Sequence, residues 1–332
     1  MPDSYAALLE TDIARQASLP DWPMFGLISD VRPFLAKACL TGQPVALVTL
    51  IKAEGGGPRR PGAQMAVARD EVAGFLSGGC VEADIVCHAR DCLVDGRPRR
   101  LAYGEGSPFF DIRLLCGRRI EILVERLMPD DAATRDLLRL SALRRDALWR
   151  SDGRVRACRE PTETVQDEAG VDAGGQAWKL YRPTLRFMVI GRDPAVLAMA
   201  MLASQSAFET TIVRIDGPAS APPVPRVAYR RTPLGKDLDC STAVVVAQHD
   251  PDSDHSTVLN ALRSNAAYVG LMGARHTIDA HLTRLRDAGV PPDRLAQLKA
   301  PVGLPLGSHT PWEIAVSVIG EVMQAFNAKN DK

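Results

Sequence analysis

Residues 185–204 read LRFMVIGRDPAVLAMAMLAS, in which a short apolar run turns at a glycine into a longer apolar stretch. The run is typical of a buried strand, and the stretch that begins at Pro194 is long enough for a helix. Similar apolar runs follow at 210–216 (TTIVRID), 242–247 (TAVVVA) and 266–273 (AAYVGLMG). Because strands that alternate with helical segments form parallel βαβ units, this part of the chain predicts a doubly wound α/β sheet.

The first half of the chain has shorter apolar segments that are separated by glycine-rich turns. Residues 45–51 (VALVTLI) predict a strand, which runs directly into the turn KAEGGGPRRPG. Further short strands are expected at 64–68, 72–76, 100–103, 112–115 and 119–124, and helices over 27–40 and from the SGGC turn at 77–80 onward. This mixture predicts an α+β domain.

The length of 332 residues fits about two domains, since a domain averages roughly 150 residues. Between Ser151 and Gln176 the apolar periodicity fades, and acidic and small residues become frequent. We interpret 151–183 as a linker. The mixed α+β domain then covers 1–150, and the doubly wound domain covers 184–332.

The charge balance excludes partners that need a strong global field. Forty Lys and Arg residues stand against forty Asp and Glu residues, so no basic surface is expected for nucleic acid or an anionic membrane. The N-terminus MPDSYAALLETDIARQ mixes acidic and apolar residues, unlike a signal peptide. No apolar run approaches the roughly 18 residues of a membrane span. We therefore expect a cytoplasmic protein.

The seven cysteines do not form a recognisable framework. They are odd in number and scattered, no CxxC occurs, and the six histidines form no HxxxH or HxH. Neither a disulfide scaffold nor a structural zinc site is predicted.

Two glycine-rich motifs of the first domain could carry chemistry. In EGGGPRRPG, Gly56 and Gly57 would let the backbone approach a ligand, and the guanidinium groups of Arg59 and Arg60 suit phosphate or carboxylate oxygens. A flexible turn with solvated arginines explains the same residues.

The SGGC motif allows a second ligand site. Gly78 and Gly79 permit a concave group of backbone N–H donors, and the start of the following helix would lower the pKa of the Cys80 thiol. A small cysteine packed in a tight strand-to-helix turn is the alternative.

The first turn of the doubly wound half departs from a dinucleotide fingerprint. VIGRDPAV keeps Gly191, but Asp193 and Val196 stand where GxGxxG needs glycines. We read Asp193 as the N-cap of a helix with Pro194 at its first position, so NAD binding is disfavoured. Asp216 ends the second strand and could accept from a ribose hydroxyl, although a charged residue at a strand end is the simpler explanation.

The last helix has a clear start. Thr310, Pro311 and Glu313 provide an N-cap, a first-turn proline and the acidic partner of a capping box. An apolar stripe follows at Trp312, Ala315, Ile319, Val322 and Phe326.

Taken together, these motifs resemble the XdhC/CoxI family of accessory proteins, which mature molybdenum hydroxylases. The resemblance rests on VALVTLIKAEGGGPRRPGAQM (45–65), GFLSGGCVEADI (74–85), the Cys116-Gly117 pair, YVGLMGAR (268–275) and APVGLPLGSHTPWEIAVSVIGEV (300–322). It covers nearly the whole chain and implies a Rossmann-like C-terminal domain. YGEGSPFFDI (103–112) further resembles the branch that serves periplasmic aldehyde oxidoreductases.

The resemblance implies a chaperone and not an enzyme. Such a protein binds molybdenum cofactor, in this branch the molybdopterin cytosine dinucleotide, protects it during sulfuration and inserts it into the apo-enzyme. Cys80 would then contact molybdenum, Arg59 and Arg60 would meet phosphate, Gln64 or Glu82 would contact the pterin, and Cys116 would lie near Cys80.

The implied partners are an apo molybdenum hydroxylase of the xanthine dehydrogenase or aldehyde oxidoreductase type, a cysteine desulfurase, the cytidylyltransferase of cofactor synthesis and a second copy of the chain. Two departures weaken the likeness: Arg118 follows Gly117 where the family has a second glycine, and Gln248-His249 replaces a Thr-His pair.

Two other functions fit parts of the sequence. One is a nucleotide-dependent oxidoreductase or nucleotidyltransferase of the Rossmann type, which the missing glycine fingerprint disfavours in its oxidoreductase form. The other is a scaffold that binds only proteins, in which the glycine and cysteine turns would be structural.

Overall fold

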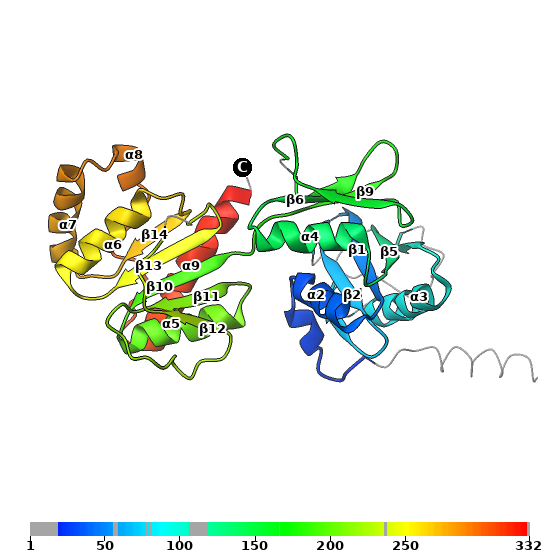
Figure 1. The fold of residues 1–332 in the computed structure, drawn as a ribbon, viewed down its shortest axis with the longest axis horizontal. Coiled ribbons are helices and arrows are strands. Elements are labelled where there is room, and N and C mark those ends of the chain that lie inside the picture. Colours follow the sequence, from blue (N-terminus) through cyan, green and yellow to red (C-terminus); the bar gives the residue numbers. More distant parts are fainter. Residues whose placement is uncertain are drawn as a thin grey trace, which may run out of the picture. The chain divides into compact units, whose positions relative to one another are not determined.

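The computed structural model describes residues 19–55, 59–77, 79, 81–105, 119–165, 167–235 and 238–330. The chain divides into two compact units, Met1–Pro183 and Thr184–Lys332 (Figure 1). Each unit has its own sheets and hydrophobic cores, so each is described by itself.

The first unit is built on a five-stranded antiparallel sheet. Its strands lie in the order β3 (Val72–Gly74), β2 (Gln64–Val67), β1 (Val45–Glu54), β5 (Arg119–Leu127) and β4 (Arg99–Gly104). These strands match five of the expected segments within a few residues. The sixth, 112–115, lies outside the described residues.

Both faces of this sheet are covered, which explains why the start of β1 is apolar at successive positions. Ala46, Val48 and Leu50 face a core formed with α3 (Glu82–Asp95). Val45 and Leu47 face the opposite core, which includes α2 (Arg32–Thr41) and α4 (Ala132–Ala142). This alternation follows from the two-residue period of a strand.

The first helix begins later than its sequence pattern predicts. A 3-10 turn at Met24–Leu27 precedes α2, which starts at Arg32. Pro33 stands in the first turn of α2, where its missing N–H leaves no helical hydrogen bond unmade. The expected start at Leu27 is therefore wrong by five residues.

The interpretation of 151–183 as a linker is also wrong. This segment supplies three strands of a second antiparallel sheet, whose order is β7 (Arg156–Arg159), β6 (Ala147–Ser151), β9 (Ala177–Tyr181) and β8 (Ala169–Val171). Trp149, Cys158 and Tyr181 pack into the core beside α2 and α4. The strands are only three to five residues long and the turns between them are acidic, so the apolar pattern is too diluted to recognise.

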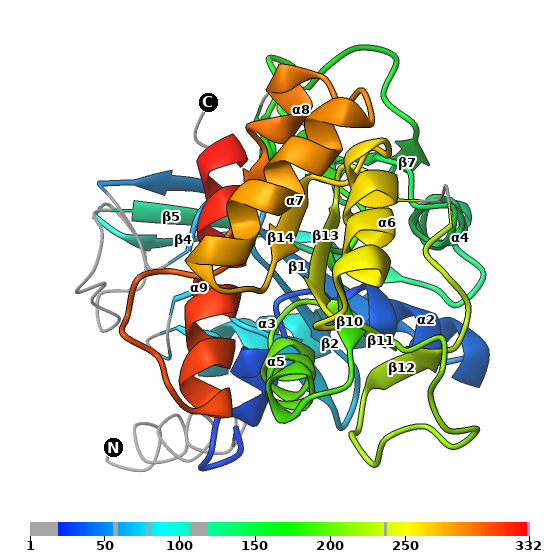
Figure 2. The ribbon, with the colours of Figure 1, turned by 90° about the vertical axis from the view of Figure 1, so that its left-hand side faces the viewer.

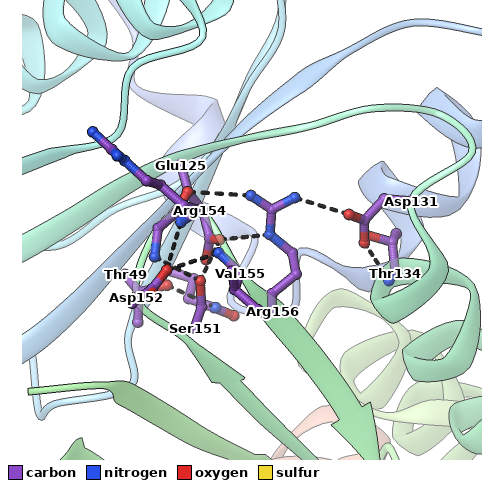
Figure 3. Close-up of polar contacts among 11 residues, drawn as sticks. Thr49, Glu125, Asp131, Thr134, Ser151, Asp152, Arg154, Val155 and Arg156 are labelled. Atoms are coloured by element: carbon purple, nitrogen blue, oxygen red, sulfur yellow. Dashed lines mark hydrogen bonds and ion pairs between the residues drawn. The ribbon is translucent and has the colours of Figure 1, made fainter. Parts of the chain in front are cut away.

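A buried ionic network joins the two sheets of the first unit (Figure 3). Arg156 on β7 lies 2.9 Å from Glu125 on β5 and 2.8 Å from Asp131, the N-cap of α4. The Ser151 hydroxyl on β6 donates to Glu125 at 2.6 Å. Burial raises the pKa of Glu125, while the charge of Arg156 and the hydrogen bond from Ser151 act in the opposite direction. The network therefore connects β5, α4 and the second sheet.

The second unit contains a six-stranded parallel sheet, as the sequence predicts. The order is β12 (Val227–Arg230), β11 (Glu209–Val213), β10 (Arg186–Gly191), β13 (Thr242–Ala247), β14 (Tyr268–Leu271) and β15 (Leu298–Lys299). The strand order reverses between β10 and β13, which is the Rossmann arrangement. The sequence pattern does not predict the short strands β12 and β15.

Helices cover both faces of the parallel sheet. On one face α5 (Pro194–Gln205) and α9 (Pro311–Asn330) lie side by side and share a core with Phe187 and Val245 (Figure 2). On the other face α6 (Pro251–Leu262) and α7 (Arg275–Asp287) pack with Met188 and Val246, and the short α8 (Pro292–Leu295) follows. In the described part of the chain, no helix combines the length and hydropathy that crossing a membrane requires.

Both predicted helix starts are confirmed. The Asp193 carboxylate accepts from the Val196 N–H at 2.9 Å, and Glu313 accepts from the Thr310 N–H at 2.9 Å. In the stripe of α9, Ala315, Ile319, Val322 and Phe326 are buried. Trp312 is 53% exposed, because it lies in the first turn, at the edge of the packed surface.

Candidate functional site

Three predicted motif segments leave the five-stranded sheet at the same end. Register pairs Glu54, at the end of β1, with Arg119, at the start of β5, and pairs Arg119 with Gly104, at the end of β4. The start of β2 and the end of β3 lie toward this end, because Thr49 pairs with Gln64 and Met65 pairs with Gly74. The strand ends that flank segments 55–63, 75–81 and 105–118 therefore lie toward the same end of the sheet.

Several predicted site residues in these segments are not among the residues that the structure describes. These are Gly56, Gly57, Gly78, Cys80 and Cys116. Arg59, Arg60, Gln64, Gly79 and Glu82 are described.

The arginine pair has one half-buried and one exposed member. The Arg59 guanidinium lies 4.7 Å from the centre of the Phe75 ring, which follows β3. Burial lowers the pKa of Arg59, whereas Arg60 is exposed. Arg59 thus links the first motif to the segment that leads into the second, and holds a positive charge partly out of water.

Lys179 is a second cation at this site, which the sequence does not reveal. Its ammonium group donates to the Gly62 carbonyl, at the end of the first motif, and lies 5.0 Å from the Tyr181 ring centre. Burial lowers the pKa of Lys179 to about 8. The charges of Arg32 and Arg59 act in the same direction, against those of Glu168 and Asp30.

Glu82 binds the strand-to-helix segment that surrounds it. One carboxylate oxygen accepts from the N–H groups of Leu76 at 3.0 Å and Ser77 at 2.7 Å. The other accepts from the Ser77 hydroxyl at 2.6 Å, the Gly79 N–H at 2.9 Å and the Val81 N–H at 3.3 Å. The N–H donors of Gly79 and Val81 are thus directed at a carboxylate of the chain itself.

These contacts determine the protonation state of Glu82. Its side chain is buried, and burial alone would raise the pKa. The hydrogen bonds from Ser77 and the neighbouring backbone outweigh burial and hold the pKa of Glu82 below its usual value. A carboxylate with this many donors is a positioning group for the segment, and Gly79, at φ +115°, supplies the left-handed conformation that the turn needs.

Gln64 also uses its polar atoms inside the protein. Its side-chain amide donates to the Thr49 hydroxyl at 3.0 Å, and its carbonyl accepts from the Tyr181 hydroxyl at 2.8 Å. Gln64 is 3% exposed, so it braces β1, β2 and β9 from within. Burial raises the pKa of Tyr181, which therefore remains a donor.

A hydrogen bond between the buried Tyr103 and the partly exposed Asp84 joins β4 and α3. The Tyr103 hydroxyl donates to the Asp84 carboxylate at 2.6 Å, and burial together with this contact raises the pKa of Tyr103. The pair fixes the first turn of α3 to the strand from which segment 105–118 departs. A tyrosine and an aspartate 19 positions apart give no signal in the sequence.

The second unit keeps a cavity at the carboxyl edge of its sheet, where the strand order reverses. Gly191, Arg214 and Asp216 line it from the ends of β10 and β11. Arg192 also lines it and is followed in the chain by Asp193, the N-cap of α5. A Cβ atom on Gly191 would lie 2.2 Å from the Ala247 carbonyl oxygen, so this glycine is required by the contact between β10 and β13.

Family models match both units. The model described as "XdhC and CoxI family" matches residues 38–104, and the model described as "XdhC Rossmann domain" matches residues 187–322. The chain therefore belongs to the XdhC and CoxI family, which confirms the resemblance seen in its motifs.

Among its relatives is the "Molybdenum cofactor insertion chaperone PaoD" of Escherichia coli (strain K12). The two are 31% identical over 293 residues, which cover 87% of this chain and 86% of that protein. A probable xanthine dehydrogenase subunit of Bacillus subtilis (strain 168) is 25% identical over 317 residues, which cover 85% of this chain and 93% of that protein.

A solved structure has the same fold. The crystal structure of a xanthine dehydrogenase (BH1974) from Bacillus halodurans matches with a TM-score of 0.69 and 22% sequence identity, and the match covers 90% of this chain and 96% of that chain. This likeness confirms a mixed α/β architecture with a Rossmann-type second unit.

Proposed function

We propose that this protein is a chaperone that binds molybdenum cofactor and inserts it into an apo molybdenum hydroxylase of the xanthine dehydrogenase or aldehyde oxidoreductase type. Membership of the XdhC and CoxI family supports this role, as does the similarity to a relative named as an insertion chaperone. The protein carries its cargo and performs no turnover of its own. The cytoplasm is the compartment in which we expect it to act.

The observation that carries the proposal is that the strand ends flanking the three motif segments lie toward one end of the first sheet, where the half-buried cations Arg59 and Lys179 also lie. Arg59 and Lys179 lie there in an environment that lowers the pKa of both groups. A bound phosphate would raise the pKa of both groups, because an anion stabilises the charged form of each cation. The residues present therefore fit the phosphates of a pterin nucleotide.

The remaining roles follow from the chemistry of each group. Arg59, Arg60 and the backbone at Gly56 and Gly57 meet phosphate, and the turn with Gly78, Gly79 and Cys80 receives the metal end. When bound, the cofactor supplies molybdenum and a dithiolene, which are soft partners for the thiolates of Cys80 and Cys116. Gln64 and Glu82 act as positioning residues, since their polar atoms already bind other parts of the chain.

Two finer features belong to the same proposal. The cargo is the cytosine dinucleotide form, and the protein shields it while the terminal sulfido ligand is installed. A cysteine desulfurase and the cytidylyltransferase that completes the cofactor would then be transient partners. A second copy of the chain is a further candidate partner.

The test is to purify the full chain from a host that makes molybdenum cofactor, and to measure bound molybdenum and the fluorescence of the oxidised pterin. We expect about one pterin per chain in the unaltered protein, and a loss of at least about tenfold in Cys80→Ala and in Arg59→Met. Cys240→Ala is the matched control, because Cys240 is an exposed cysteine of the second unit. Absence of pterin from the unaltered protein would overturn the proposal.

A further experiment tests insertion and the form of the cargo. Protein loaded with cofactor is mixed with an apo-hydroxylase, and the nucleotide released by acid from the transferred cofactor is identified as CMP or as none. Transfer with release of CMP is expected. If the apo-enzyme is activated equally well by the doubly substituted Cys80→Ala, Arg59→Met protein, the protein acts as a scaffold and not as a carrier.

A further inference from the structure

The cavity of the second unit has the position of a nucleotide site. Its volume is about 440 Å³, within the range of roughly 300–1,000 Å³ that small-molecule pockets occupy. It lies at the carboxyl ends of β10, β11 and β13, at the point where the strand order reverses. Ligands of doubly wound sheets bind at this point.

The carboxylate of Asp193 occupies the position at the N-terminus of α5 where a pyrophosphate would bind. In a dinucleotide site the pyrophosphate lies against the N-terminus of the first helix, here α5. One oxygen of Asp193 accepts from the Val196 N–H at 2.9 Å, and the other lies 2.7 Å from Nε2 of His249. A carboxylate at this position repels a phosphate and uses the donor that would bind it.

His249 keeps this carboxylate in place from the neighbouring strand. It follows β13 and has φ +59°, a left-handed conformation that non-glycine residues rarely adopt. The Asp193–His249 pair therefore connects the first residues after β10 and β13 across the point of strand reversal. At the N-terminus of α6, Asp250 accepts from the Ser253 N–H at 2.8 Å in the same way. Both helix ends at the cavity thus carry carboxylates of the chain.

The residues that would bind a ribose and a single phosphate are present at the cavity. Asp216 lies three positions after β11, where a carboxylate accepts from ribose hydroxyls, and its side chain is 71% exposed. Arg214 and Arg192 also line the cavity, and guanidinium groups suit a phosphate monoester. The Arg214 Nε atom is buried without a hydrogen-bond acceptor among the described residues, and its nearest carboxylate oxygen, on Asp216, is 3.6 Å away. Arg214 and Asp216 thus lie next to each other among the residues that line the cavity.

We propose that this cavity binds a ribonucleoside monophosphate, with the ribose hydroxyls donating to Asp216 and the phosphate accepting from Arg214 and Arg192. It does not bind a dinucleotide through a pyrophosphate on α5. The inference concerns the second unit alone and goes beyond cofactor insertion. It can fail while cofactor binding by the first unit stands.

The experiment is calorimetric titration of the full chain with CMP, AMP, their 2′-deoxy counterparts, cytidine and NAD⁺. We expect one saturable site for the ribonucleotides and about tenfold weaker binding of the deoxynucleotides, because they lack one hydroxyl donor to a carboxylate. NAD⁺ should bind no more tightly than AMP. The deoxynucleotide comparison changes only the ligand, so it does not depend on how a variant folds.

Three variants complete the test. Asp216→Asn should weaken CMP binding about tenfold and remove the preference for ribose, while Arg214→Met should weaken CMP but not cytidine. Asp193→Asn keeps a side chain that caps helices but removes the charge, and should strengthen NAD⁺ binding relative to AMP. Asp293→Asn is the control, because Asp293 is exposed on α8 and does not line the cavity.

The proposal is overturned by any of three results. These are no saturable binding of CMP or AMP at millimolar concentration, equal affinity for ribo- and deoxynucleotides, or NAD⁺ binding that is much tighter than AMP binding in the unaltered protein. The last result would mean that Asp193 moves aside for a pyrophosphate.

Discussion

Nε of Arg156 lies 2.9 Å from the carboxylate of Glu125, a side chain that is only 1% exposed. The same guanidinium reaches Asp131 at 2.8 Å, so one cation serves two carboxylates on different elements. Such a pair contributes little if both members are replaced together by apolar groups, but removal of the cation alone leaves a buried acid without a counter-charge.

Replacement of the cation should therefore destabilise the first unit strongly. We expect Arg156→Met to lower the free energy of unfolding by about 3–5 kcal/mol at pH 7, measured by urea unfolding. The deficit should shrink toward pH 5, because Glu125 without Arg156 becomes protonated more easily and a neutral acid costs less to bury. Arg139→Met, which removes an exposed pair with Asp136, is the control and should cost below about 1 kcal/mol. Equal losses in the two variants would contradict the argument.

Glu82→Gln should weaken the segment that leads into α3. A side-chain amide presents one acceptor where the carboxylate presents two, so N–H donors lose their partner, at a cost of about 2–3 kcal/mol. The pKa of Glu82 lies below its usual value of 4.5, so its contribution is complete above about pH 4.5 and is lost as the pH falls through the folded-state pKa. Unfolding curves between pH 3 and pH 7, with exposed Glu71→Gln as the control, should show the two proteins converging at the acid end. A constant difference over this range would refute the role given to the charge.

Lys179 should cause the free energy of unfolding to increase with pH above about pH 8. Its folded-state pKa of about 8 is below the unfolded value of 10.5, so the unfolded chain binds more protons between these values and stability increases with pH there. We expect a gain of about 1–2 kcal/mol from pH 8 to pH 10.5, less than the full shift implies because the side chain is only half-buried. Lys179→Met should lack this component, whereas exposed Lys37→Met should retain it. If the free energy of unfolding depends on pH in the same way in Lys179→Met and in the unaltered protein between pH 8 and pH 10.5, Lys179 is not the source of the gain.

Substitution of two glycines by alanine distinguishes the cost of a left-handed backbone from the cost of a steric clash. A Cβ atom on Gly74, at φ +86°, would lie 2.2 Å from the Gln64 carbonyl oxygen, so Gly74→Ala should cost about 3–5 kcal/mol or prevent folding. Gly175 has φ +78° but nothing within 4 Å of the added atom, so Gly175→Ala should cost about 1–2 kcal/mol. Thermal and urea unfolding of both variants measure the difference. A similar cost at the two positions would mean that β2 and β3 separate to admit the methyl group.

The second unit is predictable from local pattern because its strands are buried on both faces and read as continuous apolar runs. The capping residues Asp193 and Thr310 mark helix starts by rules that act over three or four positions. By contrast, β12 is a four-residue strand whose residues are mostly half-buried, so it carries no comparable signal.

The candidate site is predictable only in part. The glycine and arginine motifs stand out in the sequence, and register places the strands that carry them at one end of the sheet. Lys179 and Tyr181 meet Gly62 and Gln64 from 117 positions away, through a sheet whose strands resemble a linker in sequence. Contacts of this range depend on tertiary packing, which no short window of sequence contains.

The hydrogen bonds around Glu82 bear on how a cargo is given up. A loop that is ordered only by its ligand loses that order when the ligand dissociates, and it must be ordered again when the next ligand binds. Here the chain supplies its own anion to Leu76, Ser77, Gly79 and Val81, so these donors are satisfied before a cargo arrives and after it leaves. If the cofactor binds at this turn as proposed, these hydrogen bonds do not have to be remade each time it is bound or released.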